Sequence, residues 1–245
     1  MKNTVNNSPI KALMFDVFGT LVDWRSSVAS HAQSLLGDKF NIDWLAFADA
    51  WRDQYQPSMQ KVRSGEIPFS SLDNLHLINL NKIIQDFSLK GIDDLTKKNL
   101  NLAWHKLDGW SDTQEGLQRL RKKFITAPCS NGNISIMIDL ARHNHIHWDA
   151  ILGSEIAGNY KPNPIVYKAS VKALGLSPGE VMMVAAHSSD LKAAAEQGLK
   201  TAFVTRALEH GPVGSKNNHQ AETKALTPVD FSANDLNDLA QQLGC

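Results

Sequence analysis

The sequence predicts an α/β protein, a doubly wound parallel sheet into which a helical domain is inserted. Short apolar runs alternate with helical patterns over much of the chain, which is the pattern of βαβ units that build a parallel sheet. One long segment, residues 26–108, breaks this alternation with helical periodicity and no convincing strand. The chain has 245 residues, 42% of them hydrophobic, which is enough for one sizeable core and a smaller second unit.

The first strand is expected over residues 10–15, an apolar run that ends at Asp16 and precedes a tight turn at Gly19. Four later apolar runs, expected to be strands, end at Cys129, Leu152, Val184 and Val204. Helical patterns at 113–122, 134–143, 164–174 and 190–197 separate them. Ligands of parallel sheets gather at the carboxyl ends of the strands. We therefore expect Asp16, Ser130, Lys161 and residues 187–190, which follow strand ends, to meet in one crevice.

The helical segment lies between the first and second predicted strands, where it would cover the crevice as a cap and exclude water. This divides the chain into a core domain, residues 1–25 and 109–245, and a cap domain, residues 26–108. Residues 208–227 are polar and are expected to form a loop. Residues 231–243 are expected to close the core as a helix.

Composition excludes several classes of function. Lysine plus arginine and aspartate plus glutamate both number 25, and this zero net charge argues against nucleic-acid binding, which needs a basic surface. No apolar run is long enough to span a membrane, and the polar start MKNTVNNSP lacks the apolar stretch of a secretion signal. The two cysteines, Cys129 and Cys245, suit a reducing cytoplasm and predict no disulfide.

Four motifs occur in order at predicted strand ends. They are DVFGTL beginning at Asp16, Ser130-Asn131, Lys161-Pro with Tyr167 six residues later, and Asp190. This set resembles the haloacid dehalogenase superfamily, with its Rossmann-like core, and specifically its type II 2-haloacid dehalogenases. The resemblance covers nearly the whole chain, because WRDQY at residues 51–55 looks like the cap segment that bears the family's arginine.

Asp16 is the candidate nucleophile. A carboxylate can displace a good leaving group and form an ester that water then opens. Thr20 lies four residues on, where its hydroxyl could orient a carboxylate oxygen. The plainer interpretation is that Asp16 caps the following turn and that Thr20 makes an ordinary turn hydrogen bond.

Two positions separate this chain from the superfamily's magnesium-dependent phosphatases, which are the alternative function. Those enzymes usually carry a second aspartate two residues after the nucleophile, to protonate an alkoxide leaving group. Phe18 stands there and donates no proton; the type II dehalogenases carry an aromatic residue at this place. Ala186 stands where the phosphatases have an aspartate that holds magnesium, an ion that prefers several hard oxygen ligands. We therefore expect no metal and no cofactor.

The fourth motif is expected to act on water. The resemblance implies that Asp190 activates the hydrolytic water, although Asp190 could simply cap a helix. Type II enzymes often show Ser-Ser-Asn where this chain has AAH at residues 185–187. His187 could replace that asparagine as a partner of Asp190 or of the water, and it adds a titratable group. The alternative for His187 is an exposed loop histidine.

An anionic haloacid that approaches an ionised Asp16 needs compensating positive charge. Two like charges about 4 Å apart cost roughly 4 kcal/mol at an effective dielectric near 20, or about three decades of rate. The resemblance places Lys161 beside the nucleophile and implies that Arg52 receives the halide together with Asn131. Its other implied substrate- and halide-binding residues are Val17, Phe18, Ser130 and Tyr167. The plainer roles are a solvated helix face for Arg52 and core packing for Tyr167; Lys61 and Arg63 are expected on the surface.

The sequence thus predicts a cytoplasmic enzyme in which Asp16 attacks C2 of a small halogenated carboxylate and expels halide. Water then hydrolyses the Asp16 ester and releases a 2-hydroxy acid. The resemblance implies L-2-haloacids and haloacetates as substrates and a homodimer as the assembly. No nucleic-acid or membrane partner is expected. Besides the phosphatase, the alternative is a non-catalytic binding protein, against which the joint presence of Asp16, Lys161 and Asp190 argues.

Overall fold

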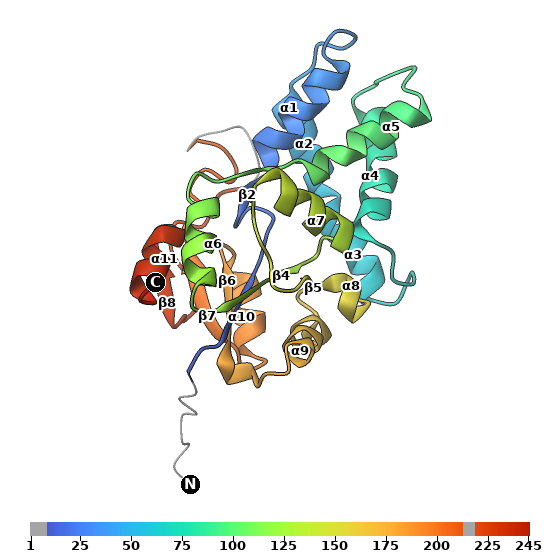
Figure 1. Ribbon diagram of the computed structural model, residues 1–245. Helices are drawn as coiled ribbons and strands as arrows, with labels where there is room; N and C mark the ends of the chain where they lie inside the picture. Colours follow the sequence, from blue (N-terminus) through green and yellow to red (C-terminus); the bar gives the residue numbers. More distant parts are fainter. Residues whose placement is uncertain (1–8, 213–218) are drawn as a thin grey trace.

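The computed structural model describes residues 9–212 and 219–245 and contains a six-stranded parallel sheet with helices on both faces (Figure 1). The strand order is β5-β4-β1-β6-β7-β8. The strands are β1 (Ala12–Phe15), β4 (Ile125–Ser130), β5 (Leu152–Gly153), β6 (Val181–Ala185), β7 (Lys200–Val204) and β8 (Phe231–Ala233). The fold class predicted from the sequence is confirmed.

Side chains of the central strands alternate between two apolar layers, as the pleat of a strand requires. In β1, Leu13 and Phe15 face the layer covered by α6 (Thr113–Arg121), α7 (Ile134–His143) and α11 (Leu236–Gln242). Ala12 and Met14 face the opposite layer, which α9 (Pro164–Ala173) and α10 (Ser188–Ala195) cover. Both faces of β1 are therefore buried, which explains why its sequence is a continuous apolar run rather than an alternating one.

The chain changes direction across the sheet at β1. It adds β4 and β5 on one side of β1 and then crosses to add β6, β7 and β8 on the other side. A reversal of this kind leaves a crevice beyond the carboxyl ends of the strands. The segments that follow β1, β4 and β6 are consequently brought to one place.

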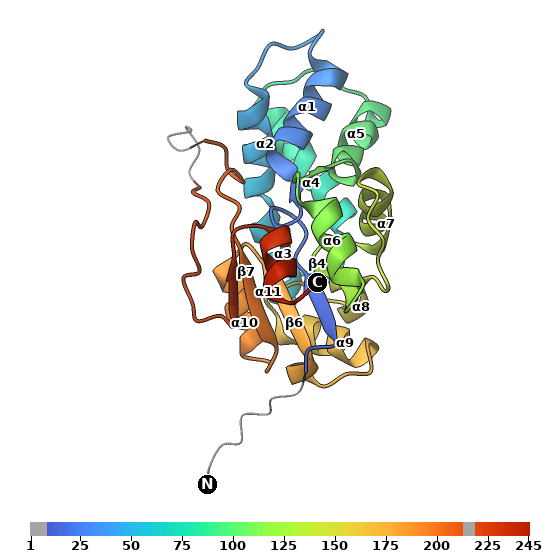
Figure 2. The same ribbon diagram turned by 60° about the vertical axis from the view of Figure 1, so that its left-hand side comes forward.

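Five helices lie between β2 (Val22–Asp23) and β3 (Asp108–Gly109), two short strands that pair antiparallel at the base of this helical insertion. The helices are α1 (Trp24–Leu36), α2 (Trp44–Asp53), α3 (Tyr55–Arg63), α4 (Leu72–Asp86) and α5 (Asp94–Asn101), followed by a 3-10 turn, Leu102–His105. The side chains of Asp23, Asp43, Ser71 and Asp93 each accept a hydrogen bond from the first turn of the following helix. These caps explain where α1, α2, α4 and α5 begin. Figure 2 shows the insertion stacked on one end of the sheet.

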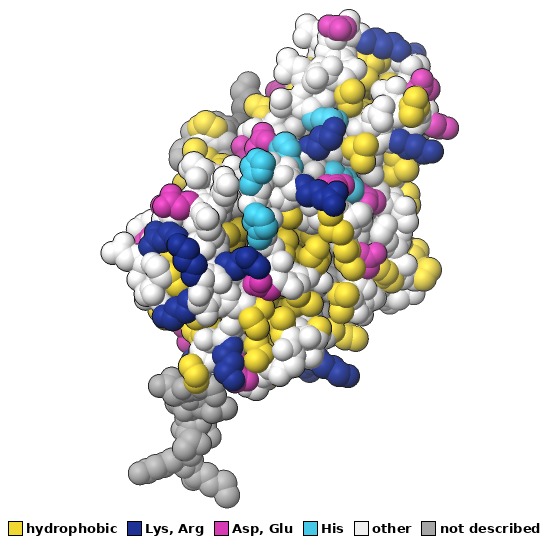
Figure 3. Space-filling model, viewed as in Figure 1, with side chains coloured by type: hydrophobic (Ala, Val, Ile, Leu, Met, Phe, Trp, Pro, Cys, Tyr) yellow, Lys and Arg dark blue, Asp and Glu magenta, His cyan; other side chains and the backbone are white. Residues whose placement is uncertain are grey.

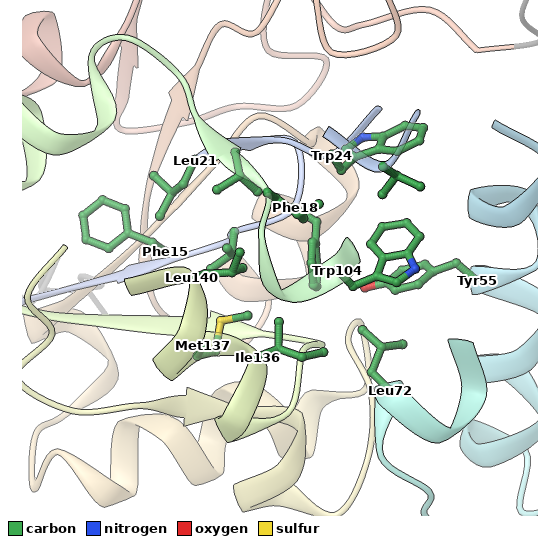
Figure 4. Close-up of a cluster of buried hydrophobic side chains, with 14 of the residues drawn as sticks. Phe15, Phe18, Leu21, Trp24, Tyr55, Leu72, Trp104, Ile136, Met137 and Leu140 are labelled. Atoms are coloured by element: carbon green, nitrogen blue, oxygen red, sulfur yellow. The ribbon is translucent and has the colours of Figure 1, made fainter. Parts of the chain in front are cut away.

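An aromatic cluster joins the insertion to the sheet (Figure 4). Phe18, which follows β1, packs edge-on against Tyr55 and Trp104, with ring centroids 6.3 and 6.1 Å apart. Trp104 in turn packs against Trp51 of α2 at 5.5 Å. All four side chains are buried. The insertion is thus fixed to the core through the residue that follows the predicted nucleophile by two positions.

The structure corrects the prediction of a single helix over residues 231–243. Residues Phe231–Ala233 form the sheet-edge strand β8, and α11 begins only at Leu236, where the Asp235 carboxylate accepts a hydrogen bond from the Asp238 amide. Helix α3 lies within the segment predicted to be helical, and the short helix α8 (Ser154–Ala157) was not predicted. The expected loop over 208–227 contains no helix or strand in its described part. The secretion-signal prediction falls mostly on residues 1–8, outside the described residues.

Within the described residues, no helix combines the length and apolar character needed to cross a membrane. The division into domains at residues 25 and 109 stays a prediction.

A buried ion pair ties together four segments beside the crevice. Arg206, just after β7, makes two hydrogen bonds of 2.7 and 2.8 Å to the carboxylate of Asp112. Its Nε donates to the carbonyl of Thr20 at 2.7 Å, and Asp112 also accepts from the Leu236 amide at 2.7 Å. Burial opposes ionisation of Asp112, but Arg206 outweighs it and lowers the pKa of this carboxyl.

We predict that Asp112→Asn lowers the free energy of unfolding by about 3–5 kcal/mol, because it leaves the Arg206 charge buried without its partner. Urea denaturation measures this loss. The matched control is Asp108→Asn, which removes an exposed partner of His143 and should cost less than about 1 kcal/mol. Equal losses in the two variants would contradict the prediction.

Candidate active site

Asp16 lies at the carboxyl end of β1 and is 7% exposed. Its backbone N–H donates to the carbonyl of Val184, which extends the pairing of β1 with β6 by one residue. The hydroxyl of Thr20 donates to Asp16 Oδ2 at 2.8 Å and accepts from the amide of Ala186 at 2.9 Å. Thr20 thus connects the candidate nucleophile to the end of β6.

The turn after Asp16 needs glycine at position 19. Gly19 has φ +85°, and a Cβ there would stand 2.0 Å from Oε1 of Glu209. Only a residue without a side chain allows both this backbone conformation and the close approach of Glu209. The turn therefore brings a carboxylate from the segment after β7 close to Asp16.

Lys161 connects two carboxylates. Its Nζ lies 3.0 Å from Asp16 Oδ1 and 2.5 Å from Asp190 Oδ2, and all three side chains are at least nine-tenths buried. The Tyr167 hydroxyl donates to the other oxygen of Asp190 at 2.5 Å. Burial lowers the pKa of Lys161, but Asp16 and Asp190 outweigh it and raise this pKa above its usual range, so the amine stays protonated.

His187 connects Asp16 to a third carboxylate. It is the N-cap residue of α10, and its Nδ1 lies 3.0 Å from Asp16 Oδ2. Its Nε2 lies 3.0 and 2.9 Å from the two carboxylate oxygens of Glu209, which is 2% exposed. Trp24 Nε1 donates to Glu209 at 3.2 Å. The predicted involvement of His187 at the site thus has a geometric basis.

The two aspartates of the site differ in acidity. Burial opposes ionisation of Asp16, but Lys161 and His187 outweigh it and hold its pKa well below the usual range. For Asp190, burial and the nearby Asp16 charge raise the pKa despite the contact with Lys161. Asp16 is therefore ionised at any ordinary pH, as a nucleophile must be.

Arg52 faces this cluster from the last turn of α2. Its guanidinium carbon lies 3.9 Å from the centroid of the Tyr55 ring and 5.5 Å from that of Trp24. It forms no ion pair with residues 9–212 or 219–245. A cation held by aromatic faces and without a carboxylate partner keeps its N–H groups for an incoming anion.

Asn131 follows β4 and is oriented by its own contacts. Its Oδ1 accepts from the Ser154 hydroxyl and the Lys161 amide, both at 2.8 Å. This directs the amide N–H groups of Asn131 away from these two partners and leaves them for the cavity or the neighbouring Tyr55. Ser130 is fully buried, and its hydroxyl accepts from the amide of Gly132 at 3.0 Å.

These residues surround a small cavity of about 200 Å³. Seven predicted site residues line it: Asp16, Phe18, Arg52, Asn131, Lys161, His187 and Asp190. Thr20 and Tyr167 lie behind them and contact the two aspartates. Val17 and Ser130 do not line the cavity, and their contact with a substrate stays a prediction. The remaining lining residues are Tyr55, Gln56, Pro162, Ser189 and Glu222.

Sequence reasoning missed Glu209 and Tyr55. Glu209 follows the end of β7, so the strand-end rule that selected Asp16 could have selected it too. Arg63, which was expected on the surface, also contacts the loop of the candidate site. Arg63 is only partly exposed, and its Nη1 donates to the carbonyl of Lys161 at 3.0 Å, which links α3 to the loop of the candidate site.

A larger hollow, about 570 Å³, lies on the outer face between α6 and the segment at His145 and His147. Figure 3 shows histidines and basic side chains gathered on this face. Arg121 and Lys122 line the hollow, and no carboxylate does. Among residues 9–212 and 219–245, no group of three or more His, Cys, Asp or Glu side chains is suited to hold a metal ion. The hollow therefore lacks the nucleophile that the small cavity offers.

Comparisons with known proteins agree on one family. A model described as haloacid dehalogenase-like hydrolase matches residues 10–198. The chain is 28% identical to (S)-2-haloacid dehalogenase 1 of Pseudomonas sp. (strain CBS-3), over 81% of this chain and 86% of the relative. A crystal structure of an L-2-haloacid dehalogenase is similar with 42% identity and a TM-score of 0.89, covering 96% of this chain and 98% of that one. A defluorinating L-2-haloacid dehalogenase gives 40% identity and the same score, covering 96% of both chains.

We predict that Lys161→Met lowers the free energy of unfolding by about 3–5 kcal/mol at pH 7.5, because Asp16 and Asp190 lose the cation between them. Because the pKa of Asp16 is lower in the folded protein than its ordinary value of 3.8, ionised Asp16 stabilises the native state at pH values above 3.8. This stabilisation is lost as the pH falls below that value. Without Lys161, the two neighbouring carboxylates repel each other, so one of them takes up a proton more readily in acid. The difference in free energy of unfolding between the wild type and the variant should therefore be smaller at about pH 4.5 than at pH 7.5. Urea denaturation at both pH values measures this; Lys192→Met, on the exposed face of α10, is the control. A deficit independent of pH would contradict the prediction.

Proposed function

The chain belongs to the haloacid dehalogenase-like hydrolases, and we propose that it hydrolyses small 2-haloacids to 2-hydroxy acids through an ester of Asp16. Haloacetates and L-2-halopropionates are the proposed substrates. The observation that carries the proposal is the buried, ionised Asp16 held between Lys161 and His187 at the edge of a small cavity. Opposite it lies Arg52, which forms no ion pair with any residue that the structure describes. The names of the relatives support the same reaction.

In the first step, a carboxylate oxygen of Asp16 attacks C2 of the haloacid, and the carbon–halogen bond breaks as the new C–O bond forms. Attack from behind inverts C2. The halide leaves toward Arg52 and the amide of Asn131, which supply hydrogen bonds to the developing anion. Lys161 and Arg52 offset part of the repulsion between Asp16 and the substrate carboxylate.

In the second step, water attacks the carbonyl carbon of the Asp16 ester and releases the hydroxy acid. Both oxygens of Asp190 are engaged, one by Lys161 and one by Tyr167. His187 instead presents Nδ1 at 3.0 Å from Asp16. These contacts favour His187 as the base that takes a proton from the water, with Asp190 holding Lys161 in place.

The phosphatase alternative is disfavoured by the same residues. Phe18 lines the cavity and has no proton for an alkoxide leaving group. Ala186 provides no ligand, so Asp16 and Asp190 alone would hold a magnesium ion with too few oxygens. We therefore propose a metal-independent reaction. The homodimer and the cytoplasmic location stay predictions.

The test is a single turnover of chloroacetate in ¹⁸O-water, with excess enzyme that has been dialysed against EDTA. We expect chloride release without added metal and label in the Asp16 carboxylate rather than in glycolate, because water attacks the acyl carbon. Asp16→Asn is the control and should release no chloride. Label in the first-turnover glycolate would mean direct attack of water on the substrate, and dependence of chloride release on magnesium would also contradict the proposal. Because of the similarity to a defluorinating relative, fluoroacetate should be assayed in parallel.

We predict that Arg52→Ala lowers kcat/KM for chloroacetate by roughly 10²–10³-fold, mostly through kcat, because the leaving halide loses its charged hydrogen-bond donor. Arg121→Ala is the matched control, since Arg121 pairs with Asp149 on the surface away from the cavity. Steady-state halide release measures both variants. Unchanged kcat/KM in Arg52→Ala would assign this side chain to a solvated helix face.

A further inference from the structure

His187 lies between two carboxylates, one at each ring nitrogen. Nδ1 is 3.0 Å from Asp16, and Nε2 is 2.9 Å from the nearer oxygen of Glu209. An ionised carboxylate only accepts hydrogen bonds, so both nitrogens must donate, and only the imidazolium form has two N–H groups. The contacts therefore fit a positively charged His187 in the resting site.

The charges around this trio support the same state. Lys161 contacts Asp16 and also Asp190. Glu209 has Arg52 in its neighbourhood and lies 3.9 Å from His210. Four carboxylates belong to this site, Asp16, Asp190, Glu209 and the cavity-lining Glu222, against the cations Lys161 and Arg52, so a protonated His187 reduces the excess of negative charge. Burial lowers the pKa of His187, but Glu209 and Asp16 outweigh it and raise this pKa well above its ordinary value.

A protonated histidine cannot take a proton from water, so His187 must change state before it acts as a base. Formation of the ester supplies the change, since it removes the negative charge of Asp16. His187 is then left with Glu209 alone at Nε2, an arrangement like the aspartate–histidine pair that orients the base in serine hydrolases. About 29% of the His187 side chain is exposed, which leaves a route for its Nδ1 proton to solvent.

We propose that His187 is an imidazolium while Asp16 attacks the haloacid and becomes a neutral base, oriented by Glu209, once Asp16 is esterified. This proposal rests on the ester mechanism proposed above. Alkylation of Asp16 releases the halide, and His187 then gives one proton to solvent. Hydrolysis returns a proton from the attacking water to Nδ1, while the hydroxyl oxygen joins the acyl carbon and the C2 alkoxide leaves, protonated, as the hydroxy acid.

The last proton has a source within this scheme. Water brings two protons, of which one goes to His187 and the other to the alkoxide of the product. The products of one cycle are therefore hydroxy acid, halide and the proton that His187 released, and the enzyme regains an ionised Asp16 beside a protonated His187. In this scheme Glu209 is a positioning residue, because it contacts His187 and not the reacting atoms.

The experiment is an ¹⁵N NMR titration of the His187 ring in substrate-free enzyme. Asp16→Asn has the shape of the carboxylate without its charge and so imitates the electrostatics of the ester. We expect a midpoint well above the ordinary histidine value in the wild-type protein, and a midpoint lower by at least about one unit in Asp16→Asn. One unit charge about 4 Å away is worth roughly three pKa units at an effective dielectric near 20. Protonated His187 should persist to higher pH in the wild type than in the variants, because only the wild type has both Asp16 and Glu209 to stabilise the imidazolium.

Three further variants complete the test. His187→Asn assigns the resonances, and Glu209→Gln should also lower the midpoint, which keeps the test open if Asp16→Asn does not fold. Asp108→Asn, which removes a carboxylate from His143 instead, should leave His187 unchanged. A wild-type midpoint near the ordinary value, or one that moves by less than about half a unit in both Asp16→Asn and Glu209→Gln, would overturn the proposal. Failure of the proposed function would show separately, as absence of halide release from chloroacetate.

Discussion

The site depends on one constraint, the burial of three carboxylates around the carboxyl end of β1. Asp16 and Asp190 contact the same ammonium group, and Glu209 joins them through His187. Buried carboxylates are unstable unless cations and hydrogen bonds accompany them. The partners come from segments far apart in sequence, which the strand order β4-β1-β6-β7 brings to one edge of the sheet. The topology thus makes it possible to keep an ionised nucleophile out of bulk water.

Lys161 and Asp190 are themselves held by groups from several elements. The Lys161 amide donates to Asn131, and its carbonyl accepts from Arg63 of α3, so the backbone on which this lysine stands is fixed by both the core and the helical insertion. Tyr167 fixes Asp190 from α9. Such supports give a precise position to groups that would otherwise rearrange to minimise their mutual repulsion. A shift of the insertion would therefore disturb Lys161 as well as Arg52.

The sequence was sufficient where the signal is local. The apolar run that ends at Asp16 and the Lys161-Pro pair are visible in the sequence without a structure. Asp16 and Lys161 both line the cavity. Glu209 lies in a polar segment whose composition indicates only a loop, and its burial results from contacts with Gly19, Trp24 and His187 that no periodicity encodes. The helix expected over 231–243 failed for a related reason: its first residues pair with β7, and such an edge strand is specified by its neighbour rather than by its own sequence.

The aromatic side of the cavity explains how Arg52 remains able to bind an anion. A carboxylate beside the guanidinium would hold it firmly but would also neutralise it. Tyr55 and Trp24 contact it through their ring faces instead, and no carboxylate of residues 9–212 or 219–245 forms an ion pair with it; Glu209 interacts with it only at longer range. His76, stacked on Trp104 with centroids 4.2 Å apart, adds no competing charge, because burial lowers its pKa to about 3 and keeps it neutral. The surrounding rings also shield part of the guanidinium from solvent, which strengthens the attraction between Arg52 and an anion in the cavity. Aromatic ring faces and an arginine that forms no ion pair within the described part of the chain together form the side of the cavity at which a departing halide is stabilised more than a neutral ligand.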